Sequence, residues 1–146
     1  MQLTLYSDYA LRTLIYLAIN DDNVTIADIA EDYKISRNHL VKVVHNLGKL
    51  GYITTTRGRH GGLRLAMRPE EINIGEVVRR TEPNFTLVEC FDRKTNQCVI
   101  TPACKLIGVL GEAFRAFNEV LNRYTLADMT TNADALRESL GIQLPS

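Results

Sequence analysis

Three cysteines are the residues of this chain with the most distinctive chemistry. Cys90, Cys98 and Cys104 follow a C-x7-C-x5-C spacing, which differs from the paired C-x2-C ligands of zinc ribbons. An odd number of cysteines disfavours a closed set of disulfides. Pro102 is expected to bend the chain so that the three sulfurs converge. Cys104, expected at a helix N-terminus, would be biased toward the thiolate by the helix dipole.

Several chemistries fit these thiols. Three thiolates leave one position for a different ligand, which suits an iron–sulfur cluster, a zinc site or a redox thiol pair. The cysteines could also be unrelated small apolar side chains. A cysteine-dependent enzyme is poorly supported, because all three histidines lie in a basic helix or hairpin and no general base is near the cysteines. We therefore predict that the protein is not an enzyme.

Charge is distributed unevenly along the chain, although the formal net charge is zero. Residues 1–33 have a net charge of −5, residues 34–68 have eight basic and no acidic side chains, and residues 69–146 have a net charge of −3. A segment without acids is typical of a surface that binds a polyanion, although a solvated basic face would look the same.

The order of elements predicts a mainly α fold with a small β-hairpin. Ser7, a capping box from Thr25 to Asp28, and Ser36 mark the starts of three helices. Strands are expected at 52–56 and 63–67 around a Gly-rich turn, and a fourth helix at 74–81. Three helices followed by a hairpin form a winged helix-turn-helix, so residues 1–81 are predicted to be a DNA-binding domain.

In such a fold the second helix of the motif enters the major groove. Arg37 and Asn38 are the first candidates for base contacts, because they can bind guanine and adenine edges in a bidentate manner. The hydroxyl of Ser36 suits a phosphate. The full predicted DNA-binding set is Ser36, Arg37, Asn38, His39 and Lys42 on the helix, and Arg57, Arg59 and His60 on the wing.

The C-terminal half is predicted to consist of a cysteine-bearing loop at 82–103, a long helix at 104–124 and a short helical segment at 125–146. The apolar positions of the long helix alternate steps of four and three, which is typical of a coiled-coil seam: Leu106, Leu110, Ala113, Phe117, Val120 and Tyr124. We expect this helix to form a homodimer; packing on the chain's own domain is the alternative. Without a basic leader or a long apolar run, the protein is expected to be cytoplasmic and to have no membrane partner.

Taken together, several motifs resemble the iron–sulfur winged-helix transcriptional repressors, in particular the nitric-oxide-sensing members of that family. The resemblance covers nearly the whole chain. Its motifs are Ser7-Asp8-Tyr9-Ala-Leu-Arg12, Ser36-Arg37-Asn38-His39-Leu-Val-Lys42, the wing 57–65, Ile74-Gly-Glu-Val-Val78, and 98–104 with its two cysteines. It implies a homodimeric repressor that binds a palindromic operator while its cluster is intact and releases the DNA when nitric oxide nitrosylates the cluster.

The resemblance also implies a set of cluster ligands. Cys90, Cys98 and Cys104 match the family's cysteine ligands, and Asp8 of the partner subunit matches the remaining one. Other members use a C-x5-C-x5-C spacing, so both [4Fe–4S] and [2Fe–2S] clusters stay open here. Two further readings keep DNA binding: a cluster-free thiol/disulfide switch, and a sensor of iron–sulfur status.

Overall fold

The computed structural model describes residues 1–21 and 23–143. Within them the chain forms seven α-helices, three short 3-10 helices and one two-stranded hairpin, so the predicted mainly α class is confirmed. The α-helices are α1 (Leu5–Ile19), α2 (Ile26–Tyr33), α3 (Arg37–Lys49), α4 (Ile74–Thr81), α5 (Leu106–Asn122), α6 (Leu126–Met129) and α7 (Ala133–Leu140). The strands are β1 (Ile53–Thr56) and β2 (Gly62–Leu65), and the 3-10 helices are η1 (Pro69–Glu71), η2 (Glu89–Phe91) and η3 (Thr101–Ala103).

The first helix begins one turn earlier than predicted. Thr4, not Ser7, is the N-cap of α1, and its hydroxyl accepts a hydrogen bond from the Ser7 backbone nitrogen at 3.2 Å. Thr4 is itself held by Glu82, whose Oε1 accepts from the Thr4 backbone nitrogen at 2.8 Å. Ser7 is fully buried. The contact from Glu82, at the end of α4, therefore fixes where α1 starts.

The helix-turn-helix follows the prediction closely. Thr25 and Asp28 form the expected capping box at the start of α2, and Lys34 has a left-handed backbone with a φ of 56° in the turn before α3. Ser36 is the N-cap residue of α3, as predicted, although its side chain makes no capping hydrogen bond. The apolar face of α3 is buried and consists of Leu40, Val43, Val44 and Leu47.

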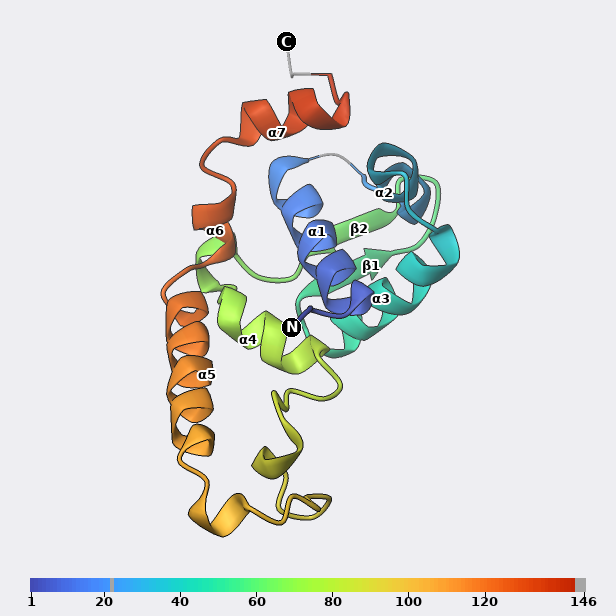
Figure 1. Ribbon diagram of the computed structural model, residues 1–146. Helices are drawn as coiled ribbons and strands as arrows, with labels where there is room; N and C mark the ends of the chain where they lie inside the picture. Colours follow the sequence, from blue (N-terminus) through green and yellow to red (C-terminus); the bar gives the residue numbers. More distant parts are fainter. Residues whose placement is uncertain (22, 144–146) are drawn as a thin grey trace.

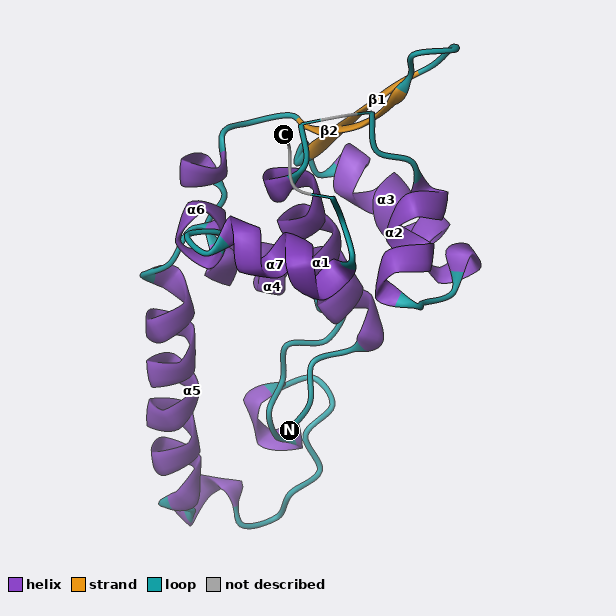
Figure 2. Ribbon diagram, turned by 90° about the horizontal axis from the view of Figure 1, so that it is seen from above, coloured by secondary structure: helices purple, strands orange, loops and turns teal. Residues whose placement is uncertain are grey.

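The hairpin is shorter than predicted and projects from the helical body (Figure 2). Its strands pair antiparallel, with Ile53 opposite Leu65 and Thr56 opposite Gly62. Its base is anchored in the core, because Ile53 and Leu63 are buried and the Leu63 nitrogen donates to the Val24 carbonyl at 2.7 Å. An anchored base leaves the tip free to project as a wing.

Helix α5 stands beside the domain and is attached at its C-terminal end (Figure 1). It is shorter at both ends than the predicted 104–124. The side-chain amide of Asn73 donates to the Asn122 carbonyl at 2.7 Å, and Arg79 Nη1 donates to Asn122 Oδ1 at 2.6 Å. Gly75 packs so closely on Asn122 that a Cβ would overlap its side chain. The other end of α5 leads into the cysteine loop.

The C-terminal segment forms two helices, where one was predicted. A capping box of Thr125 and Asp128 starts α6, and α7 then turns back to the domain (Figure 1). Arg137 Nε donates to the Ile19 carbonyl at the end of α1 at 2.8 Å, and Leu140 packs against the core. None of the helices in the described part of the chain is both long and apolar enough to span a membrane.

Candidate DNA interface and cysteine loop

Helix α3 presents its predicted DNA-binding residues to solvent. All five, Ser36, Arg37, Asn38, His39 and Lys42, are exposed. Their exposure follows from helical periodicity, because Leu40, Val43, Val44 and Leu47 take the opposite face into the core. The N-terminal half of α3 can therefore present Arg37 and Asn38 to base edges.

The wing tip carries the second part of the predicted interface. Arg57, Arg59 and His60 are exposed, and Gly58, with a φ of 104°, allows the turn. Among the residues that the structure describes, Arg68 is the one basic residue of 34–68 in an ion pair. The remaining cations of this segment are not neutralised by those pairs, which suits a phosphate backbone.

The three cysteines lie on an irregular loop, at some distance from the helical body (Figure 1). Cys90 lies in η2, Cys98 in the irregular segment between η2 and η3, and Cys104 directly after η3. All three are free and half-buried. Across residues 1–21 and 23–143, no three His, Cys, Asp or Glu side chains are gathered closely enough to hold a metal ion. The expected convergence of the sulfurs is thus not present within a single chain.

Cys104 precedes helix α5 instead of beginning it. Its backbone is extended (φ −78°, ψ 114°), and Lys105 is the N-cap. The segment around Cys98 has its own hydrogen bonds: the Cys98 nitrogen donates to Asn96 Oδ1 at 3.0 Å, and Thr101 Oγ1 donates to the Cys98 carbonyl at 2.8 Å. These bonds order the turn between the last two cysteines.

An aromatic cluster that was not predicted from the sequence anchors the cysteine loop to α5. The ring centroids of Phe85 and Phe114 are 5.0 Å apart, and those of Phe91 and Phe114 are 6.2 Å apart. Phe117, placed by the sequence in the dimer seam, lies 6.5 Å from Phe85 of its own chain. Part of the predicted seam therefore packs on the chain's own loop, as the alternative reading proposed.

The predicted ligand Asp8 is on the half-exposed side of α1 and already has a partner. Arg12 Nη2 donates to Asp8 Oδ2 at 2.7 Å, and Arg12 Nε donates to Asp8 Oδ1 at 3.0 Å. The Arg12 guanidinium carbon lies 5.8 Å from the Tyr9 ring and 5.9 Å from the Tyr33 ring. Sequence reasoning missed this pair, although its i,i+4 spacing was the available signal.

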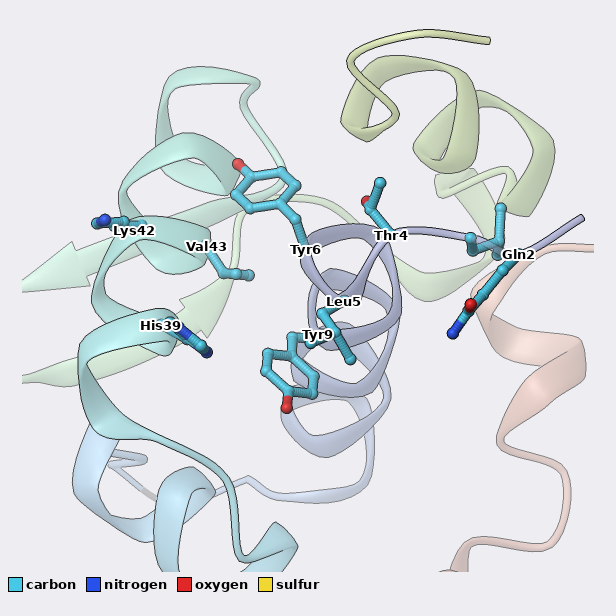
Figure 3. Close-up of a pocket in the computed structure, with 9 residues that line it drawn as sticks. Gln2, Thr4, Leu5, Tyr6, Tyr9, His39, Lys42 and Val43 are labelled. Atoms are coloured by element: carbon cyan, nitrogen blue, oxygen red, sulfur yellow. The ribbon is translucent and has the colours of Figure 1, made fainter. Parts of the chain in front are cut away.

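Next to Asp8, the start of α1 and helix α3 enclose a groove of about 640 Å³. Leu5, Tyr6 and Tyr9 line it from α1, and His39 and Val43 face them from α3 (Figure 3). The rings of Tyr9 and His39 have centroids 6.3 Å apart. We call this feature the α1–α3 groove. It places a predicted DNA-binding residue in contact with the helix that carries Asp8.

A family model described as Rrf2, iron-dependent transcriptional regulator, matches residues 3–132. The chain belongs to the Rrf2 family. Among its relatives is the HTH-type transcriptional regulator NsrR of Shouchella clausii, 56% identical over 142 residues that cover 96% of this chain and 95% of that protein. The NsrR of Bacillus subtilis is 54% identical over 142 residues, covering 96% of this chain and 97% of that protein.

A solved structure of T. potens IscR has the same fold as this Rrf2 chain. It superposes with a TM-score of 0.71 at 22% identity and covers 100% of this chain and 93% of that one. The predicted resemblance and the winged-helix fold class are thereby confirmed. The Rrf2 relatives are named as transcriptional regulators and not as enzymes, so this chain is a transcriptional regulator.

Proposed function

We propose that this Rrf2 regulator is a homodimeric repressor that releases its operator in response to nitric oxide. In this proposal α3 and the wing bind a palindromic DNA site. Cys90, Cys98 and Cys104, with Asp8 of the partner subunit, hold an iron–sulfur cluster. The observation that carries the proposal is three free, half-buried cysteines on one loop, in a family described as iron-dependent.

The donor set fits such a cluster in its chemistry. Thiolates are the usual ligands of iron–sulfur clusters, and the three cysteines are free in the described chain. The Asp8 carboxylate is accessible, with 37% of its side chain exposed. When bound, a cluster supplies iron atoms with which nitric oxide reacts. The described residues of one chain do not gather even three such ligands, so cluster binding would require the cysteine loop to close around the cluster.

The surface of α5 supports a homodimer. None of the residues of α5 is buried in the single chain. Leu106, Val109 and Val120 of α5 are exposed at 58%, 61% and 45%, and Tyr124, just after the helix, at 45%. Exposed apolar side chains along one helix favour association, because burying them removes apolar surface from water. A dimer would also present two copies of α3 to two half-sites.

The chain's own contacts provide a route from the loop to DNA. Asp8 either reaches across to the partner's cysteines or is held by Arg12 on its own helix. The neighbouring Tyr9 contacts His39 of α3. A change in the position of α1 would therefore move a residue of the recognition helix, and a coupling of about 1–3 kcal/mol is typical of such control.

Anaerobic purification followed by titration with nitric oxide tests the proposal. We expect a coloured protein with stoichiometric iron and sulfide, whose operator affinity at fixed salt falls as the visible absorption changes. The number of iron atoms distinguishes [4Fe–4S] from [2Fe–2S]. An iron-free protein that loses DNA only when a disulfide forms would establish the thiol switch instead. A cluster protein that responds to iron supply and not to nitric oxide would establish a sensor of iron–sulfur status.

A further inference from the structure

The outer face of helix α3 carries an aliphatic side chain among polar ones. Val41 is 47% exposed, whereas the other large apolar residues of α3 are buried. The remaining exposed side chains of the helix can all form hydrogen bonds: Arg37, Asn38, His39, Lys42, His45 and Lys49. A single exposed valine is ordinary on most protein surfaces. The position of Val41 on the predicted recognition helix is what makes it informative.

Val41 shares one side of α3 with the two residues predicted to contact bases. It follows Arg37 by four residues and Asn38 by three, and α3 is helical throughout this segment. Residues at these spacings are neighbours on a helix surface. When the N-terminal half of a recognition helix enters the major groove, such a residue lies one turn further along the same groove. Val41 would therefore face the base edges next to those that Arg37 and Asn38 contact.

The side chain of Val41 borders a hollow of about 490 Å³ on this side of the helix. Val44 of α3, Ile26 at the start of α2 and Thr55 of strand β1 line the same hollow. Val44 is buried and Ile26 is half-buried. Val41 is thus the outermost of three aliphatic side chains that border the hollow. The site offers apolar contact and room for a small group that projects from a base edge.

We propose that Val41 specifies a thymine in each half-site of the operator by contact with its C5-methyl group. This inference rests on the part of the proposed function in which α3 binds DNA, and not on the cluster. A valine side chain has no hydrogen-bond donor or acceptor. The base-edge feature that it can recognise in the major groove is therefore the thymine methyl group. Contact between the two removes apolar surface from water, and a base without the methyl group loses this gain.

The charges around Val41 favour DNA over an apolar protein surface as the occupant. Lys42 is its neighbour in sequence, and Lys49 lines the same hollow. Neither lysine takes part in an ion pair among the residues that the structure describes. An apolar partner would bury these cations without compensation, which is costly. The phosphates of a duplex would neutralise them while Val41 faces the bases.

Replacement of thymine by deoxyuridine tests the contact, because it removes the methyl group and nothing else. The full-length protein, purified anaerobically, first selects its operator from a library of random duplexes at fixed salt. Each thymine of a half-site is then replaced in turn, and the affinity of each duplex is measured. We expect replacement at one position to lower the affinity about fourfold, and replacement in both half-sites to lower it about tenfold or more.

A pair of variants assigns the effect to Val41. Val41→Ala should bind the thymine and uracil duplexes with nearly equal affinity at that position, and alanine favours the helix, so the fold is kept. Lys42→Ala is the matched control, because it should weaken binding to both duplexes by the same factor.

The outcomes separate this inference from the proposed function. Half-sites without thymine, a wild-type affinity that no uracil changes, or a Val41→Ala protein with the wild-type ratio overturns the inference alone. A protein that selects no duplex overturns the proposed function and this inference with it. A protein that selects an operator but keeps it in nitric oxide overturns the proposed sensing alone, and the uracil series still decides the role of Val41.

Discussion

Arg12 binds both carboxylate oxygens of Asp8, from one turn further along the same helix. The two hydrogen bonds are 2.7 and 3.0 Å long, and the side chains are 41% and 37% exposed. A half-exposed i,i+4 pair of this kind contributes only about 0.3–0.5 kcal/mol. Arg12 can therefore hold Asp8 when no stronger partner is present, and a cluster can displace it at little cost.

We predict that Asp8→Ala loses most of the nitric-oxide dependence of operator binding, since the proposed link between the subunits is removed. Arg12→Gln should keep the response but shift it to a higher concentration of nitric oxide. Without Arg12 as a competitor, Asp8 binds the cluster more tightly, and about twofold more nitric oxide is needed to release half of the operator. Operator binding titrated anaerobically measures both midpoints. An Asp8→Ala protein with a wild-type response would rule out this route.

The DNA interface makes a prediction in two parts. Arg37→Ala and Asn38→Ala should each weaken specific operator binding by about 1–3 kcal/mol and relax sequence preference, because base contacts are lost. Arg59→Ala at the wing should weaken binding to all sequences. It should also reduce the slope of log affinity against log salt concentration by about one. Lys94→Ala, an exposed cation on the cysteine loop, is the control. If it weakens binding as much as Arg59→Ala, the wing has no special role.

The attachment of α5 makes a stability prediction. A Cβ at Gly75 would overlap the Asn122 side chain, so Gly75→Ala should lower the free energy of unfolding by about 1–3 kcal/mol. Gly108, inside α5, has open space around its Cβ position in the single chain. Gly108→Ala should instead raise stability by roughly 0.5–1 kcal/mol, because alanine favours a helix. Urea unfolding compares the two, and equal effects would contradict the proposed role of close packing.

The pH dependence of stability reports on Tyr33 and Tyr16, whose ring centroids lie 6.0 Å apart. Burial raises the pKa of Tyr33 from 10.0 to about 12, with Arg12 opposing the shift, and burial together with Asp32 also raises the pKa of Tyr16. Because the folded state holds these protons more tightly, the two tyrosines contribute fully to the free energy of unfolding below pH 10. This contribution is lost as the pH rises toward 12. Urea unfolding at pH 8 and pH 11 should show that the free energy of unfolding falls less between these pH values in Tyr33→Phe than in wild type. Tyr124→Phe, an exposed site, should behave as wild type.

Much of the DNA-binding half was predictable, because its signals are local. The spacing of Leu40, Val43, Val44 and Leu47 fixes the buried face of α3, and the Thr25–Asp28 capping box starts α2 as predicted. The predicted start of α1 was wrong, because both Thr4 and Ser7 can cap a helix. Glu82 decides between them from 78 residues away, and sequence periodicity carries no such information.

The cysteine loop was less predictable for a different reason. Its spacing identifies candidate ligands, but the structure of one chain does not gather them into a site among its described residues. Its position depends on the contacts of Phe85 and Phe91 with Phe114, between segments distant in sequence. In the proposed dimer, the position of Asp8 relative to the cysteines would depend on the partner subunit, which no pattern within one chain specifies.

The separation of charge along the chain has a consequence for how the protein finds its operator. The exposed cations of α3 and the wing belong to a segment with eight basic and no acidic side chains, and both flanking segments are negative. The molecule therefore combines zero net charge with a concentration of exposed cations on α3 and the wing. Near DNA these cations are attracted to the phosphates, which would favour approaches that bring α3 and the wing to the duplex. Orientation during approach would thus be favoured without the general stickiness that a large positive net charge brings.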